Sequence, residues 1–292
     1  MRGTAPVPSG AYARASRSLH EAPEPPVPSG AYARASRSLH EAPEPPVGIW
    51  VRLLGLVVVG AVAMSACGGA AEHAPDLSSS QAVSFPSRDG VELEGRLFGR
   101  GTTAVVLSHM LPADQRSWFD LAGRLADQGY LVLTYDFRGY CPGGDGGCSA
   151  GERDISSIWQ DVLGAVDLVR SRGATSVVLV GASMGGTASL VAAGQQGQDI
   201  EAVIALSAPA SIEGLVADPS LLQRISAAKL FVAGVGDASA ADAAEELYAM
   251  SPPPKRVEIV PADDHGSDLL TGPQAEVVKR LIETTLARYA PA

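Results

Sequence analysis

The sequence lacks any stripe of basic residues, and this absence excludes one class of partner. The formal net charge of the 292-residue chain is -10 at pH 7, and the part after Ala66 holds about 16 basic against 28 acidic residues. A protein that grips nucleic acid needs clustered lysines and arginines to neutralise phosphates. We therefore expect no nucleic-acid partner.

The sequence also has little that could hold a cofactor. It contains no cluster of metal-ligand residues at a typical spacing, no dinucleotide-binding glycine loop and no phosphate cradle. Asp263, Asp264 and His265 could imitate a ligand set, but a catalytic role for His265, described below, explains them better. We predict a protein that uses neither a metal nor a cofactor.

No apolar run is long enough for a permanent membrane span. The longest apolar stretch, residues 49–66, is interrupted by Arg52. Its uninterrupted part, Leu53–Ala63, is about half as long as a bilayer-crossing helix, so residues 49–66 are predicted to be a signal peptide. Small residues before Cys67 resemble the cleavage box of a bacterial lipoprotein, although Met64 stands where leucine is usual. This predicts lipidation of Cys67, with plain secretion and an uncleaved anchor as alternatives. We then expect an exported protein, held by its lipid at the outer face of the bacterial cytoplasmic membrane, or located in the periplasm or at the cell surface.

The first 48 residues contain a tandem repeat. Pro6–Val27 recurs without change as Pro26–Val47. Repeat folds need at least three units to bury a face, and this segment has almost nothing apolar to bury, so we interpret it as disordered. The apolar stretch that follows favours a translation start near Val47 or Val51, in which case the repeat is not translated. Residues 67–81, rich in Ala, Ser and Gly, are predicted to be a flexible tether.

Only three cysteines are present, which leaves two if Cys67 is lipidated. Cys141 and Cys148 bracket a glycine-rich loop and are close enough in sequence to pair in an oxidising compartment. Closing so short a loop contributes about 2 kcal/mol, so the predicted disulfide serves mainly to hold the loop in shape. The alternative is two free thiols.

From residue 82 to residue 292, apolar runs alternate with helical patterns. This alternation predicts one α/β domain, with a mostly parallel eight-stranded sheet and helices on both faces. The first two strands are expected to form an antiparallel hairpin. The expected strands are 82–85, 91–98, 104–107, 131–135, 177–180, 202–206, 230–233 and 257–260, and the expected helices are 118–128, 155–172, 186–193, 240–250 and 273–288.

A candidate nucleophile, Ser183, lies between a predicted strand and a predicted helix, in Gly181-Ala182-Ser183-Met184-Gly185. On such a sharp turn the crowded backbone demands a residue without a side chain two positions before and two positions after the serine. Gly181 and Gly185 meet this demand. The motif alone is weak in a chain with 32 glycines, so its weight comes from the order of the motifs around it.

Five segments in this order resemble the α/β-hydrolase family over roughly residues 82–289. Each follows a predicted strand, and they are Leu107-Ser108-His109-Met110, Tyr135-Asp136-Phe137-Arg138-Gly139, Gly181-Ala182-Ser183-Met184-Gly185-Gly186, Gly234-Val235-Gly236-Asp237 and Asp264-His265-Gly266. The resemblance implies the α/β-hydrolase fold and a serine, an acid and a histidine in that chain order. Asp136 and Arg138 are expected to be structural. After Gly139 the family usually has another glycine and a serine, whereas this chain has Tyr140 and Cys141.

Histidine is the natural base for a serine hydroxyl because its unperturbed pKa lies near 6.5. Outside the repeat the chain has only His73, His109 and His265. His73 falls in the tether, and His109 matches the family's histidine beside the oxyanion site, which does not take the proton. His265 remains as the predicted base, in a loop after the last strand. The alternative is a surface histidine.

Asp237 is the predicted acid that orients His265. It stands four residues past a predicted strand and matches the family's Gly-x-x-Asp pattern. Its first rival, Asp242, is expected to face solvent on the next helix. The other rivals, Asp263 and Asp264, are too close in sequence to His265 to reach its far ring nitrogen easily.

Two backbone N–H groups are expected to stabilise the negative oxygen of a tetrahedral intermediate. Met184 supplies one, at the N-terminus of a helix. The resemblance places the other at Met110, where the family usually has glycine. The Met110 side chain either narrows the acyl side of the pocket or packs as ordinary core.

Only about twenty residues, 207–227, separate two consecutive predicted strands, which is too few for a separate cap domain. We therefore expect an open site and a serine hydrolase of carboxylesterase type, which cleaves small or accessible esters or thioesters through an acyl-enzyme. Minimal dienelactone hydrolases are similar, but they usually have cysteine where this chain has Ser183. The alternatives are an exopeptidase or acyltransferase with the same triad, and a non-catalytic ligand-binding lipoprotein. The expected partners are a small-molecule ester and, through the lipid, a membrane; the protein is expected to be a monomer.

Overall fold

The computed structural model describes residues 77–196 and 200–292. The predicted repeat and signal peptide, Cys67 and most of the predicted tether lie outside the described residues. Of the tether, Leu77–Ser79 forms one 3-10 turn, η1, and Gln81 begins the first strand. No helix in these two described ranges is long and apolar enough to cross a membrane.

The described part folds around one eight-stranded sheet. In sheet order the strands are β1 (Gln81–Pro86), β2 (Glu92–Phe98), β4 (Leu131–Tyr135), β3 (Thr103–Ser108), β5 (Ser176–Ala182), β6 (Ala202–Leu206), β9 (Ala228–Gly234) and β10 (Lys255–Val260). β1 pairs antiparallel with β2, and β2 pairs antiparallel with β4, while all later neighbours are parallel. The predicted mostly parallel sheet and its opening hairpin are therefore confirmed.

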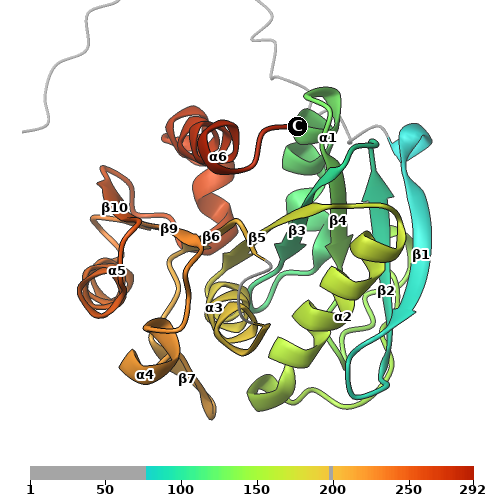
Figure 1. The fold of residues 1–292 in the computed structure, drawn as a ribbon, viewed down its shortest axis with the longest axis horizontal. Helices are drawn as coiled ribbons and strands as arrows, with labels where there is room; N and C mark the ends of the chain where they lie inside the picture. The colour runs from blue at the N-terminus through green and yellow to red at the C-terminus, as the bar shows by residue number, and fades with distance from the viewer. Residues whose placement is uncertain (1–76, 197–199) are drawn as a thin grey trace, which may run out of the picture. The chain divides into compact units, whose positions relative to one another are not determined.

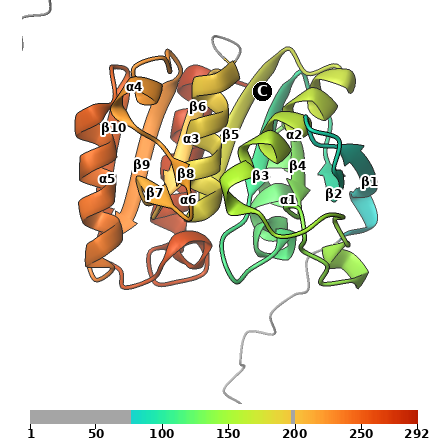
Figure 2. The same ribbon diagram turned by 90° about the horizontal axis from the view of Figure 1, so that it is seen from below.

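Helices cover both faces of the sheet. One face carries α1 (Phe119–Asp127) and α6 (Ala275–Tyr289), and the other carries α2 (Trp159–Ser171), α3 (Met184–Gln196) and α5 (Ala238–Met250) (Figure 1). Figure 2 views the molecule from the side of this second group. The short 3-10 turns are η2 (Gln115–Trp118), η3 (Gly144–Gly146), η4 (Ile155–Ser157) and η5 (Gly266–Leu270).

The central strands are buried throughout and mostly apolar because both of their faces are covered. Every residue of β3, β4 and β6 is buried. Side chains alternate along a strand, so Val106 of β3 joins the core under α2 and α3 while Val105 joins the core under α1 and α6. This explains why the sequence shows continuous apolar runs in place of a polar and apolar alternation.

The connection from β6 to β9 contains no cap domain in the described part of the chain. It forms a small hairpin, β7 (Ser211–Ile212) with β8 (Leu215–Val216), followed by the single turn α4 (Pro219–Leu222). None of these elements was predicted. The helix α3 also begins at Met184, two residues earlier than predicted, so that Met184 is its first residue.

Candidate active site

Ser183 lies on a sharp turn between β5 and α3. Its φ is +48°, in the left-handed region that serine adopts only when the surrounding structure demands it. A Cβ on Gly181 would collide with the carbonyl of Gly185, and a Cβ on Gly185 would collide with the carbonyls of Ser108 and His109. Glycine is therefore required at both positions, as the sequence pattern predicted.

Backbone hydrogen bonds hold this turn. The Ser183 N–H donates to the carbonyl of Leu206 on β6 at 2.8 Å, and the Ser183 carbonyl accepts from Gly186 N–H at 2.9 Å. Ala182 and Met184 on either side are fully buried, whereas Ser183 is half-buried. The turn thus places the half-buried Ser183 at the carboxyl edge of the sheet, where α/β folds bind ligands.

His265 and Asp237 meet at the same edge. His265 Nδ1 lies 2.5 Å from Asp237 Oδ2, and the two side chains are 44% and 15% exposed. β9 and β10 pair in parallel, and the loops that follow them are joined by a hydrogen bond from Gly236 N–H to the carbonyl of Ala262 at 2.9 Å. Among the described residues no other carboxylate is within hydrogen-bond distance of His265.

The loop of His265 lies against the turn of Ser183. A Cβ on Gly266 would be 3.4 Å from the Cβ of Ala182 and 2.5 Å from Sδ of Met110. Within residues 77–196 and 200–292, however, no hydrogen bond joins Ser183 Oγ to His265. In enzymes without substrate this bond is often long or poorly aligned. The catalytic roles of Ser183, Asp237 and His265 stay predictions.

The two amides proposed for the oxyanion site have no acceptor among the described residues. The N–H of Met184 points from the first turn of α3, and the N–H of Met110 lies in the loop after β3, the strand that pairs with β5. Unpaired amides at this edge are available to a developing negative charge. The Met110 side chain is 5% exposed and belongs to the core under α1 and α6, which favours its interpretation as core.

His109 is fully buried and supports the Met110 loop. Its Nε2 accepts a hydrogen bond from Phe137 N–H at 3.1 Å. The proton of the neutral ring therefore lies on Nδ1, which donates to the carbonyl of Met110 at 2.9 Å. Burial lowers the pKa of His109 to about 4. A neutral ring with both nitrogens engaged holds the loop in place and is not available as a base.

A comparison with known families agrees with this geometry. A family model described as serine aminopeptidase, S33, matches residues 100–268 of the 292-residue chain. The chain belongs to this family. Among curated proteins, epoxide hydrolase A of Mycobacterium tuberculosis is 38% identical over 114 residues, which cover 38% of this chain and 33% of that protein. The chain thus matches about a third of the length of this curated relative.

Solved structures share the fold of this α/β-hydrolase. An esterase of Pyrococcus furiosus has a TM-score of 0.60 and 19% identity, covering 73% of this chain and 92% of that one. A dienelactone hydrolase of Anabaena variabilis has a TM-score of 0.58 and 22% identity, covering 72% and 99%. The enol-lactonase of Burkholderia xenovorans has a TM-score of 0.58 and 18% identity, covering 70% and 99%. At these identities the likeness shows the α/β-hydrolase fold alone.

One polar residue of this α/β-hydrolase that the sequence did not reveal is Gln115, which is buried beside Asp136. The N–H and Nε2 of Gln115 donate to the two carboxyl oxygens of Asp136 at 3.0 and 2.9 Å, and its Oε1 accepts from Thr134 Oγ1. Burial raises the pKa of Asp136 to about 7. Gln115 begins the short turn η2 and belongs to no sequence motif, so no pattern could identify it.

Asp136 and Arg138 have the structural role that was expected of them. Arg138 is buried and donates to Asp161 of α2 from its N–H and its guanidinium, and to Asp89 in the β1–β2 turn from the far end of the guanidinium. This network fixes the segment after β4 against α2.

The structure joins Cys141 to Cys148 in a disulfide, and both residues are exposed. No group of three or more His, Cys, Asp or Glu side chains in the described residues is arranged to hold a metal ion.

Proposed function

We propose that this α/β-hydrolase is a serine hydrolase that cleaves small or accessible carboxylic esters through an acyl-enzyme. The observation that supports it most is the hydrogen bond between His265 and Asp237. The loop that carries His265 lies against the strained turn of Ser183. An acid, a base and a partly accessible serine at one sheet edge are the parts that this chemistry requires.

In the proposed reaction, Oγ of Ser183 attacks the ester carbonyl and gives its proton to Nε2 of His265. Asp237 accepts a hydrogen bond from Nδ1–H, which keeps the ring in the correct tautomer and stabilises its positive charge. The oxyanion binds the N–H groups of Met110 and Met184. His265 then protonates the leaving alcohol. In the second half of the reaction, His265 takes a proton from water as the water attacks the acyl-enzyme, and gives it to Oγ of Ser183 as the acid leaves.

An open site favours small or accessible substrates. The connection from β6 to β9 supplies only a hairpin of two two-residue strands and one helical turn, so no cap closes over Ser183 in the described part. The structural neighbours include proteins named as esterases, a dienelactone hydrolase and an enol-lactonase. Their names support esters and lactones as the substrate class.

A peptidase is the second candidate because the matching family is described as serine aminopeptidase. The same triad can cleave an amide, and the two activities are separated by comparing aminoacyl p-nitroanilides with p-nitrophenyl esters. A higher kcat/KM on the anilides would replace the esterase proposal with the peptidase.

The proposal is tested with a fluorophosphonate, which labels only an activated serine. We expect covalent labelling of the wild type, none in Ser183→Ala, and hydrolysis of p-nitrophenyl esters that varies along a series of acyl chain lengths. If the wild type is not labelled, or if Ser183→Ala is labelled equally, the protein is not a serine hydrolase of this kind, and the non-catalytic alternative takes its place.

We also propose export with a lipid on Cys67. Support comes from the sequence alone, where small residues precede Cys67. In a bacterial host that is fed labelled palmitate, the chain should carry the label, and Cys67→Ser should not. A mature chain that keeps the repeat peptides would contradict both the export signal and the late translation start.

A further inference from the structure

Tyr140 contacts Met184, whose amide is proposed for the oxyanion site, and His109, which supports the Met110 loop. Its side chain is 5% exposed. The ring meets the ring of His109 edge-on, with centroids 4.6 Å apart, and its hydroxyl lies 3.9 Å from Sδ of Met184. Since His109 holds the carbonyl of Met110, Tyr140 packs against both halves of the oxyanion site.

Tyr140 also lies directly before the loop that the disulfide closes. The carbonyl of Tyr140 accepts from Ser149 N–H at 2.9 Å, and the bond between Cys141 and Cys148 lies directly beyond this pair. The segment between the cysteines is Pro142-Gly143-Gly144-Asp145-Gly146-Gly147. A run so rich in glycine has a large conformational entropy unless it is constrained.

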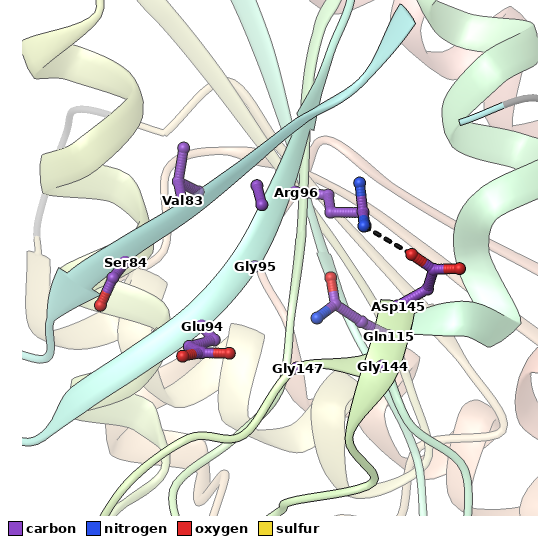
Figure 3. A pocket seen from close by; sticks show the side chains of 10 residues that line it. Val83, Ser84, Glu94, Gly95, Arg96, Gln115, Gly144, Asp145 and Gly147 are labelled. Carbon is purple, nitrogen blue, oxygen red and sulfur yellow. Dashed lines mark hydrogen bonds and ion pairs between the residues drawn. The ribbon is translucent and has the colours of Figure 1, made fainter. Parts of the chain in front are cut away.

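Two further contacts tie this loop to the rest of the molecule. Asp145 accepts a hydrogen bond from Arg96 of β2 at 2.7 Å (Figure 3). Both residues line a cavity of about 290 Å³ between the strands and the loop. Gln115 Nε2 donates to the carbonyl of Gly146 at 2.7 Å as well as to Asp136. The Met110 loop is therefore held near both of its ends, by Tyr140 at His109 and by Gly146 at Gln115.

We propose that Tyr140 is a positioning residue of the oxyanion site and that the Cys141–Cys148 disulfide keeps it in place. The inference rests on the proposed function and deepens it. Tyr140 does not touch the reacting atoms; it fixes the two elements that carry the amides. Because those amides meet a charge that develops fully only in the transition state, loss of their alignment lowers kcat and leaves KM nearly unchanged.

The first test replaces the tyrosine. In Tyr140→Leu, which loses both contacts, kcat on p-nitrophenyl acetate should fall about tenfold or more, a fraction of the effect of removing an oxyanion donor. Tyr140→Phe keeps the ring against His109 and loses only the hydroxyl, so it should recover most of kcat. KM should stay near the wild-type value in both variants.

A matched control separates positioning from stability. Tyr130 is equally buried, 4% exposed, but lies just before the amino end of β4. Tyr130→Leu should lower the unfolding temperature as Tyr140→Leu does and leave kcat unchanged. Equal kcat in Tyr140→Leu and the wild type, or an equal loss of kcat in Tyr130→Leu, would overturn the proposal.

The second test removes the disulfide by replacing Cys141 and Cys148 with serine together. Both residues are exposed, so the substitution leaves the core intact. We expect the double serine replacement to lower kcat, as Tyr140→Leu does. The factor by which it lowers kcat should be smaller in the Tyr140→Leu background than in the wild-type background. Unchanged kcat, or fully additive losses, would show that the disulfide does not act through Tyr140.

The labelling of Ser183 distinguishes the two levels of failure. If the fluorophosphonate does not label the wild type, the proposed function fails. If it labels the wild type and not Ser183→Ala, while Tyr140→Leu and the double serine variant are labelled at the wild-type rate, the hydrolase stands and only the role of Tyr140 is wrong.

Discussion

The accessibility of Ser183 is set by its backbone. A residue with a Cβ at a φ of +48° carries a cost of about 1 kcal/mol or more. Hydrogen bonds to Leu206 and from Gly186 fix the turn and offset that cost. Ser183 is therefore half-buried at the sheet edge, between two fully buried neighbours.

The pairing of Asp237 with His265 predicts a large effect from a small substitution. Asp237→Asn keeps the shape of the side chain but favours the wrong tautomer of His265, so kcat should fall by about 10³- to 10⁴-fold. The measurement is kcat on p-nitrophenyl acetate. Asp242→Asn, on the exposed face of α5, is the control and should be silent. If Asp242→Asn lowered kcat more than Asp237→Asn does, Asp237 would not be the acid that orients His265.

Burial shifts the pKa values of His109 and Asp136 in opposite directions on folding. In an unfolded chain, the pKa of aspartate is about 4 and that of histidine about 6.5. Burial raises the pKa of Asp136 to about 7 and lowers that of His109 to about 4. Between about pH 4 and 6.5, the unfolded chain therefore carries the proton on histidine and the folded chain carries it on aspartate. Each state binds one proton, so the pair contributes almost no pH dependence to stability in this range.

Single substitutions should separate the opposing contributions of His109 and Asp136 to the pH dependence of the unfolding free energy. In His109→Gln only Asp136 remains, the folded state binds more protons, and the unfolding free energy should fall as pH rises from about 4 to 7. In Asp136→Asn only His109 remains, the unfolded state binds more protons, and the unfolding free energy should fall as pH is lowered from about 6.5 to 4. Urea unfolding across this range measures both slopes. Slopes of the same sign in the two variants would contradict the assignment.

At the scale of elements, Arg138 joins three parts of the chain. Its side chain is buried between Asp161 of α2, which is fully buried, and Asp89 of the β1–β2 turn. Removing one partner of a buried ion pair leaves an uncompensated charge, which costs more than the pair contributes. The network therefore makes the position of α2 depend on one guanidinium.

Arg138→Met should lower the unfolding free energy by about 3–5 kcal/mol, because Asp161 is left buried without its partner. Adding Asp161→Asn to Arg138→Met should restore part of this loss, since the second change removes the orphaned charge. Denaturant unfolding of the two single variants and the double variant gives the coupling energy. A double variant as unstable as the sum of the single ones would show that the pair is not coupled.

The elements that the sequence revealed are those with a pattern of their own. All eight strands of the main sheet were predictable because each carries a hydrophobic pattern bounded by turn residues. The central strands are continuous apolar runs, and β2 alternates exposed and buried residues. The hairpin of β7 and β8 was not, since each of its strands has only two residues and no period can be recognised over that length. The same limit applied to α4, a single turn that begins at Pro219.

The candidate site residues could be proposed from the sequence to a similar degree, and their catalytic roles stay predictions. Ser183, Asp237 and His265 could be chosen because each follows a strand whose carboxyl end lies at one sheet edge. Gln115 and Tyr140 could not, because their importance comes from contacts between loops that are distant in the sequence. Such contacts depend on the packed structure and leave no trace in local spacing.

At the scale of the molecule, the candidate site is assembled from the loops that follow β3, β5, β9 and β10. Leu77, the first described residue, packs against the core under α1 and α6. β1 is an edge strand, yet its Phe85 is buried against Tyr135 with ring centroids 5.9 Å apart. The domain therefore requires β1, and this requirement gives a measurable boundary.

A shortened chain that starts at Leu77 should fold with the unfolding free energy of the full chain and hydrolyse p-nitrophenyl acetate with the same kcat/KM. A chain that starts at Ser87 lacks β1 and Phe85, so it should lose at least the roughly 3–5 kcal/mol that removing a large buried aromatic costs. Denaturant unfolding and esterase assays on the two chains measure these differences. If the chain from Leu77 were as unstable as the chain from Ser87, residues before Leu77 would have to contribute to the core, and the predicted domain boundary near residue 82 would be wrong.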